Sequence, residues 1–240
     1  GNEVSFTTVI PVAPGVPVLT TTAITNIGTT TATSGGIVTS DGNSTVSARG
    51  ICWNTTGSPT TADSATTNGA GTGTFTSQLA NLAVGTTYHV RAYAINNYGT
   101  GYGNEITFTT NPIAPTVVTH AVTNITTTTA ATGGEVTFNG GANITARGVC
   151  WSTSPNPTTA DNHTTDGTGS GAFTSSITGL TIATSYYMRA YATNSAGTAY
   201  GQQIQFNSLC ANVAVDFDDN SYNTVQIGSQ CWLSQNLRSE

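Results

Sequence analysis

The chain has 240 residues, enough for about two ordinary domains, and only 7% of them are charged. Its basic residues are five arginines, and the net charge of −6 excludes a protein that binds along nucleic-acid phosphates. No apolar run approaches the roughly 18 residues of a membrane-spanning helix, so no membrane span is expected. Composition therefore favours a β-rich extracellular module.

The chain is predicted to be folded and all-β. Its 50 threonines and 27 glycines would also suit a disordered, glycosylated stalk. Aromatic and β-branched residues recur at regular spacing, however, which is typical of half-buried strands. Glycine, threonine and asparagine interrupt every long stretch, so helices are not expected.

A tandem repeat sets the domain organisation. Shifting the sequence by 98 residues aligns 17–110 with 115–208, and 48 of the 94 aligned positions are identical without a gap. Residues 48–53 (ARGICW) return as 146–151 (ARGVCW). The alignment predicts two copies of one domain.

The chain begins with a piece of a third copy. Residues 1–8 (GNEVSFTT) match 103–110 (GNEITFTT), which is the last predicted strand of the first full copy. This segment, with Val4 and Phe6 as its candidate contacts, is expected either to close a preceding domain or to add a strand to another molecule. Proline-containing linkers are predicted at 9–16 and 111–114.

Turn residues divide each copy into short strands. In the first copy the predicted strands are 17–24, 31–39, 46–53, 72–79, 87–95 and 101–109, with a weaker strand at 60–66. Residues 87–95 show the alternation of apolar and polar side chains that a strand with one buried face requires. So many short strands in about 100 residues predict a two-sheet β-sandwich.

The repeats resemble a known family. Residues 82–96 read L-x-x-G-T-x-Y-x-V-R-A-Y-A-x-N, which resembles the tyrosine corner and sixth strand of fibronectin type III-like domains. The repeated G-[IV]-C-W and G-T-x-Y-G motifs are similar to tandem copies in surface proteins of Bacteroidetes-type bacteria. The resemblance implies tandem Ig-like sandwiches and leaves function open, because such sandwiches have many roles.

The tail, residues 209–240, differs from the repeats and is predicted to contain a short β-hairpin at 213–227. It is similar to the opening of the Fibrobacter major paralogous domain, whose hallmark is D-x-D-G-N-x-Y-x-T-V-x-I-G-x-Q-x-W-M-x-x-N-L. Asp219 replaces the glycine of that hallmark and Leu233 replaces its methionine. The family's domain is longer, so the tail would be a partial copy, and the resemblance implies a secreted bacterial surface protein.

The four cysteines fall into two classes. Cys210 and Cys231 flank the predicted hairpin, and in an oxidising compartment they are expected to form a disulfide. Cys52 and Cys150 occupy one equivalent position beside a tryptophan in the two copies. They are expected to be small buried thiols, with intermolecular pairing as the alternative.

A repeated set of arginine and aromatic residues is the main candidate contact surface. Its members share one sequence parity on two neighbouring strands, which suggests either an intradomain arginine–aromatic ladder or an exposed platform for a glycan or a neighbouring subunit. They are Arg49, Trp53, Arg91 and Tyr93, with their equivalents Arg147, Trp151, Arg189 and Tyr191.

Two further candidates rest on short patterns. Asp216, Asp218 and Asp219 cluster oxygens as a calcium loop does, but they lack the glycine and distal glutamate of an EF-hand, so a solvated turn is the alternative. Residues 63–65 (DSA) resemble the short O-glycosylation acceptor of Bacteroidetes-type bacteria, with Ser64 as the acceptor.

These patterns exclude some classes of function and favour others. No nucleophile elbow, paired carboxylates or metal-ligand spacing stands out, so neither an enzyme nor a cofactor is expected. The tandem repeat, the low charge and the spare strand predict a structural module, a segment or subunit of an extracellular filament or stalk. Its partners would be other copies of the chain or neighbouring repeats of a longer chain. The alternative is an adhesin or a carbohydrate-binding accessory module of a larger secreted protein.

Overall fold

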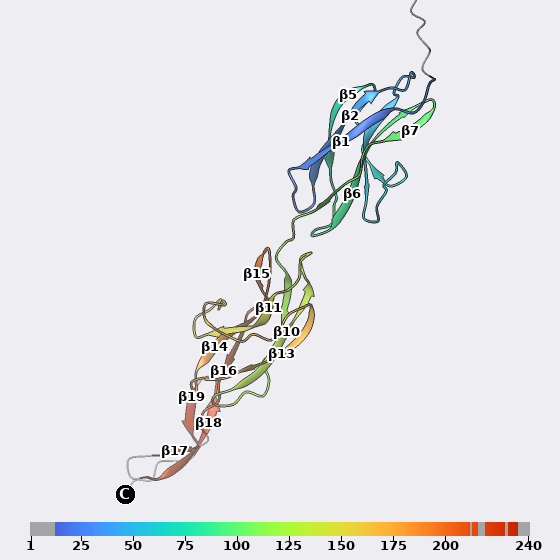
Figure 1. Cartoon of the computed structure of the whole chain (residues 1–240). Helices are drawn as coiled ribbons and strands as arrows, with labels where there is room; N and C mark the ends of the chain where they lie inside the picture. The colour runs from blue at the N-terminus through green and yellow to red at the C-terminus, as the bar shows by residue number, and fades with distance from the viewer. Residues whose placement is uncertain (1–12, 212, 216–218, 229, 235–240) are drawn as a thin grey trace, which may run out of the picture. The chain divides into compact units, whose positions relative to one another are not determined.

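The computed structural model (Figure 1) describes residues 13–211, 213–215, 219–228 and 230–234. By its contacts the chain divides into two units, Gly1–Asn111 and Pro112–Glu240, a boundary that falls inside the predicted linker 111–114. Every regular element in the described ranges is a β-strand, and every strand pairing is antiparallel, which confirms the predicted all-β class. Within these ranges no helix has the length and apolarity needed to cross a bilayer.

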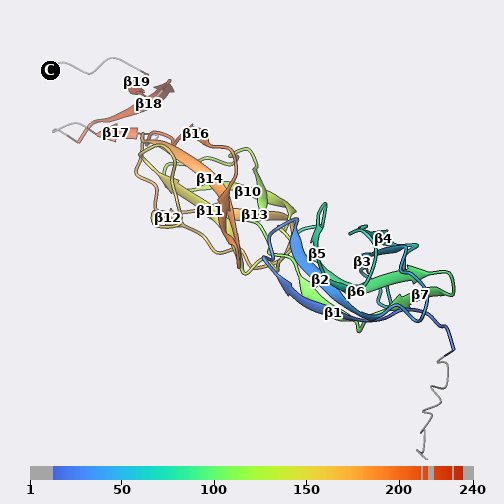
Figure 2. The ribbon, with the colours of Figure 1, turned by 90° about the horizontal axis from the view of Figure 1, so that it is seen from above.

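The first unit is a sandwich of two sheets (Figure 2). Its strands are β1 Val18–Thr25, β2 Ala32–Ser40, β3 Ala48–Asn54, β4 Ser64–Ala65, β5 Gly73–Leu79, β6 Thr87–Asn96, β7 Gly99–Tyr102 and β8 Ile106–Thr109. One sheet has the order β1-β2-β5, and the other has the order β4-β3-β6-β7, with β8 also paired to β6. The predicted strands are therefore present, with shifts of one or two residues at most of their ends.

The core of the first unit lies between these two sheets. Val38 on one sheet packs with Ile51 and Val90 on the other, and the exposed fraction of all three side chains is 2% or less. Burial of side chains of this size contributes about 1.5–3 kcal/mol each. Apolar residues that alternate along the strands thus hold the two layers together.

The last predicted strand, 101–109, is in fact two strands, and this corrects the prediction. β7 and β8 follow one another along β6, and between them the Gly103 amide donates to the carbonyl of Ala92 at 2.9 Å. At this break Thr21 of β1 reaches the second sheet, where its Oγ1 accepts from the Ala92 amide at 2.9 Å and donates to the Asn104 carbonyl at 2.6 Å. A Cβ on Gly103 would lie 2.6 Å from that Oγ1, so the crossing requires glycine.

A tyrosine fixes the entry into the long strand β6. The hydroxyl of Tyr88 accepts from the Ala83 amide at 2.9 Å, and its ring stacks on Phe108 with the centroids 5.8 Å apart. In the second unit the Tyr186 hydroxyl accepts from the Thr181 amide at the same distance. Both copies of the predicted tyrosine-corner motif therefore bond to backbone five residues upstream.

The second unit repeats the first. Its strands are β9 Thr116–Thr119, β10 Ala130–Phe138, β11 Ala146–Ser152, β12 Asn162–His163, β13 Gly171–Ile177, β14 Ser185–Asn194, β15 Gly197–Tyr200 and β16 Ile204–Asn207. One sheet has the order β13-β10-β9, and the other has the order β12-β11-β14-β15, with β16 paired to β14. The register is preserved, since Cys52 pairs with Arg91 and Cys150 pairs with Arg189.

The tail of the second unit forms a small sheet of its own, with the order β17-β18-β19. Its strands are β17 Val213–Val215, β18 Ser221–Ile227 and β19 Gln230–Leu233. The first two strands form the predicted hairpin, and β19 adds a third strand that the sequence reading did not include.

Candidate interaction surfaces

The repeated arginine and aromatic residues do not form one platform, which corrects the prediction of a shared face. Side chains of directly paired residues lie on the same face of an antiparallel sheet. Cys52 on β3 pairs with Arg91 on β6, so Trp53, the next residue on β3, points to the opposite face from Arg91. Arg49 shares the face of Trp53, and Tyr93 shares the face of Arg91. The second unit has the same register.

Arg49 lies on the inner face of the β4-β3-β6-β7 sheet, the face that packs against the other sheet. There it binds the glycine-rich connection that leads into β5. The Arg49 guanidinium lies 5.3 Å from the ring centroid of Phe75, and its Nη1 donates to the carbonyls of Gly71, Thr72 and Gly73 at 3.2, 2.7 and 3.2 Å. Arg147 makes the same contacts in the second unit, over Phe173. The polar groups of this arginine are thus used within its own domain.

On the outer face of the same sheet, Arg91 stacks on a tyrosine ring that was not among the predicted contact residues. The Arg91 guanidinium lies 4.6 Å from the ring centroid of Tyr102, and its Nε donates to the Gly103 carbonyl at 3.1 Å. Arg189 lies 4.8 Å from the Tyr200 ring. Both tyrosines belong to the repeated G-T-x-Y-G motif, and its recurrence at the 98-residue offset was the signal that could have identified them.

Three of the four aromatic members of the set are buried, and Trp53 is partly buried. The exposed fraction of the Tyr93 side chain is 4%, and its hydroxyl donates to the Thr66 carbonyl at 2.6 Å. Tyr191 repeats this bond to Thr164, and the exposed fraction of Trp151 is 7%. These rings stabilise their own domains and leave little ring surface for a glycan or a subunit.

Cys52 and Cys150 are buried free thiols, as predicted. The Cys52 Sγ lies 3.4 Å from the carbonyls of Pro59 and Arg91, to which it donates. Burial raises the pKa of each thiol to about 11, an effect that the nearby Arg91 or Arg189 opposes. Neither thiol is a reactive group at neutral pH.

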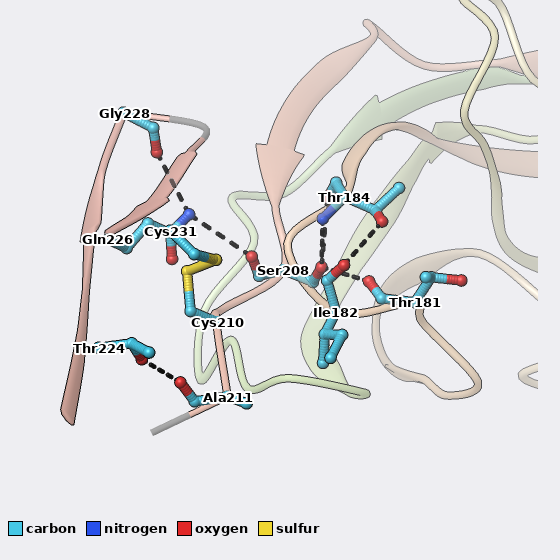
Figure 3. Close-up of a disulfide and its surroundings, with 10 residues drawn as sticks. All are labelled: Thr181, Ile182, Thr184, Ser208, Cys210, Ala211, Thr224, Gln226, Gly228 and Cys231. Carbon is cyan, nitrogen blue, oxygen red and sulfur yellow. Dashed lines mark hydrogen bonds between the residues drawn. A yellow bond between two sulfur atoms is a disulfide. The ribbon is translucent and has the colours of Figure 1, made fainter. Parts of the chain in front are cut away.

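The predicted disulfide between Cys210 and Cys231 is confirmed, and it ties β19 to the segment that leaves the second sandwich (Figure 3). The two Cα atoms are 5.8 Å apart, and the bond closes a loop across a sequence separation of 21 residues. Gln226 on β18 adds a hydrogen bond from its Nε2 to the Ser208 carbonyl at 3.5 Å. Closing a loop of this size contributes about 3 kcal/mol, so the small sheet is anchored on this side.

The opposite side of the tail sheet is apolar and exposed. Val225 pairs with Trp232, and alternation along β17 and β18 places three more large apolar residues on the same face. We call this surface the tail face; its exposed fractions run from 43% at Val225 to 63% at Ile227. Its apolar members are Val213, Val215, Val225, Ile227 and Trp232.

The remaining predicted sites stay predictions. Val4, Phe6, Asp216 and Asp218 lie outside the described residues. Asp219 sits in the turn before β18 with a φ of 63°, and the described part of the chain holds no group of three His, Cys, Asp or Glu residues that could bind a metal. Ser64 is exposed on the two-residue strand β4, and its glycosylation stays a prediction.

Comparison with known proteins adds no relative. No family model matches the chain, and a search of the curated proteins found no match. The resemblances to fibronectin type III-like and Fibrobacter major paralogous domains therefore remain predictions, and function has to be argued from the chain's own residues.

Proposed function

We propose that the chain is a non-enzymatic structural module of a secreted bacterial surface protein, a segment or subunit of an extracellular filament or stalk. The observation that carries the proposal is the tail face, five large apolar side chains exposed on a sheet that a disulfide anchors to the sandwich. Exposed apolar patches of this kind mark contact with another molecule. The Ig-like relationship belongs to the same proposal, and the hydroxyl bonds of Tyr88 and Tyr186 support it.

The partner that suits the tail face is a second copy of the chain. The polar positions of this face are Ser221, Asn223 and Gln230, so its described residues offer no charge by which a different partner would be selected. Two identical sheets can pack face to face about 10 Å apart, which buries both apolar faces in one self-complementary contact. A filament needs a second joint as well, and strand addition by residues 1–8 is our proposal for it.

Two substitutions on the tail face test the proposal. In sedimentation velocity over a concentration series, we expect the protein to associate reversibly. Val225→Thr combined with Ile227→Thr keeps β-branched residues on β18 but removes apolar surface, so association should weaken at least about tenfold. The matched control is Val118→Thr, which changes an exposed valine on β9 and should leave association unchanged.

Two results would contradict the proposal. One is a protein that stays monomeric throughout the series, and the other is a double variant that associates as strongly as the unmodified chain. Intact Cys210–Cys231 pairing in the variant, measured by mass spectrometry, shows that its tail has folded. The arginine and aromatic residues do not favour the adhesin alternative, because their side chains contact other residues of the same domain.

A further inference from the structure

The second sandwich has a solvent-open hollow on the outer face of its β9-β10-β13 sheet, with a volume of about 500 Å³. In the first sandwich longer side chains stand at the equivalent place, where Thr33 Oγ1 on β2 donates to Gln78 Oε1 on β5 at 3.1 Å. The equivalents of these two residues are Ala131 and Ser176, which are paired across β10 and β13 and line the hollow. Two shorter side chains therefore open the space.

The hydrogen bonds at this place also differ between the two sandwiches. In the first sandwich Asn68 Nδ2 donates to the outward-pointing carbonyl of Thr76 at 3.0 Å. The equivalent of this asparagine is Asp166, whose Oδ2 accepts from Thr164 Oγ1 at 2.7 Å. At this position a carboxylate acceptor therefore replaces the amide donor of Asn68, and both Asp166 and Thr174 line the hollow. Such a pair favours a ligand that brings hydroxyl donors.

The rest of the lining suits a neutral ligand with many hydroxyls. His120 replaces the Thr22 of the first sandwich and lies exposed on the hollow, so it adds a ring that can donate or accept. The Ser176 hydroxyl adds a further group that can donate or accept, and Ala131 adds apolar surface. A bare cation would need several carboxylates, and the lining supplies only one.

We propose that the second sandwich binds a carbohydrate unit in this hollow. The Asp166 carboxylate and the Thr174 carbonyl accept hydrogen bonds from sugar hydroxyls, and His120 contacts the ligand at the rim. The first sandwich does not bind, because Gln78 fills the space and Asn68 occupies the carbonyl. This site is independent of assembly through the tail face, so either proposal can fail alone.

The test is an NMR titration of the isotope-labelled chain with the methyl glycosides of glucose, galactose, mannose and N-acetylglucosamine. With at least one of them we expect millimolar binding, with amide shifts at 131–133 and 174–176 and none at the equivalent positions 33–35 and 76–78. Asp166→Asn introduces the amide donor that Asn68 provides in the first sandwich. Ser176→Gln introduces the longer side chain that Gln78 provides there. Each should weaken binding at least about tenfold. Amide signals away from the hollow that keep the positions they have in the unmodified chain show that both variants are folded.

A reciprocal graft makes the test sharper. The quadruple variant Thr22→His, Thr33→Ala, Asn68→Asp and Gln78→Ser should bring glycoside-dependent shifts to the first sandwich. The proposal is overturned if no glycoside shifts the 131–133 and 174–176 amides, if both single variants bind like the unmodified chain, or if the graft does not respond. Identical shifts with calcium chloride alone would identify a cation site instead and would overturn it too.

Discussion

Burial, rather than pairing, protects the two free thiols of the chain. Cys52 and Cys150 sit on equivalent strands with no exposed surface, and each thiol donates to two backbone carbonyls. The folded state therefore disfavours the thiolate, which is the reactive form of cysteine. This leaves Cys210 and Cys231 to form the disulfide without competition.

The raised thiol pKa values predict a loss of stability in alkali. Each thiol titrates at about 11 when folded and near its ordinary value of 9.0 when unfolded. Between these pH values the folded chain binds more protons than the unfolded chain, so the free energy of unfolding is fully retained below pH 9 and falls as the pH rises toward 11. Urea denaturation across this range measures the decline.

The matched control for this prediction is the double variant Cys52→Ala and Cys150→Ala, which should show a shallower decline. All other ionisable groups are the same in both proteins, so the difference between the two curves isolates the thiols. Equal slopes would contradict the prediction.

At the scale of elements, each sandwich depends on a break in its last strand. Thr21 of β1 bonds to Asn104 in the break between β7 and β8 and to Ala92 on β6, and so joins the two sheets. In the second unit Thr119 makes the matching bond to the Ala190 amide at 3.0 Å beside Gly201. The glycine is required at this point because backbone and side chain of the crossing strand occupy the place of a Cβ.

Gly103→Ala is therefore expected to destabilise the first sandwich by about 1–3 kcal/mol, as overpacking of a close contact does. The control is Gly15→Ala, where an added Cβ has no neighbour within 4 Å and the change should stay under about 0.5 kcal/mol. Urea denaturation of the three proteins measures both effects. Equal stability of the two variants would show that the crossing tolerates a side chain.

The same elements show what the sequence could and could not predict. Alternating apolar residues and the 98-residue repeat were enough to predict the all-β class, and the cysteines that flank the hairpin predicted the disulfide. The faces of Arg49 and Arg91 depend on the register between β3 and β6, where residues of unlike parity pair. A register shift by one residue would reverse the faces, so sequence parity alone could not decide them.

The break between β7 and β8 at Gly103 and the hollow of the second sandwich were not predicted, for a related reason. Residues 101–109 were predicted as one strand, whereas the crossing of β1 at Gly103 divides them between β7 and β8. The replacement of Gln78 by Ser176 was visible in the alignment, but its meaning depends on Ala131 and Asp166 lying beside it across the sheet. Contacts between distant segments decided both features.

At the scale of the whole molecule, the chain combines two copies of one sandwich with a disulfide-anchored sheet that leaves an apolar face exposed. The arginines of the described ranges and the repeated aromatic residues stabilise the sandwiches internally. The tail face is left as the surface best suited to assembly, which is why the proposal of a filament or stalk segment centres on it.

Electron microscopy of the purified protein at high concentration tests this account most directly. We expect regular fibres whose axial repeat matches two chains joined through their tail faces, and we expect them to be lost in the Val225→Thr, Ile227→Thr variant and kept in Val118→Thr. Fields of separate, unassembled molecules at every concentration, or fibres that persist unchanged in the double variant, would contradict the claim that this chain assembles through its tail face.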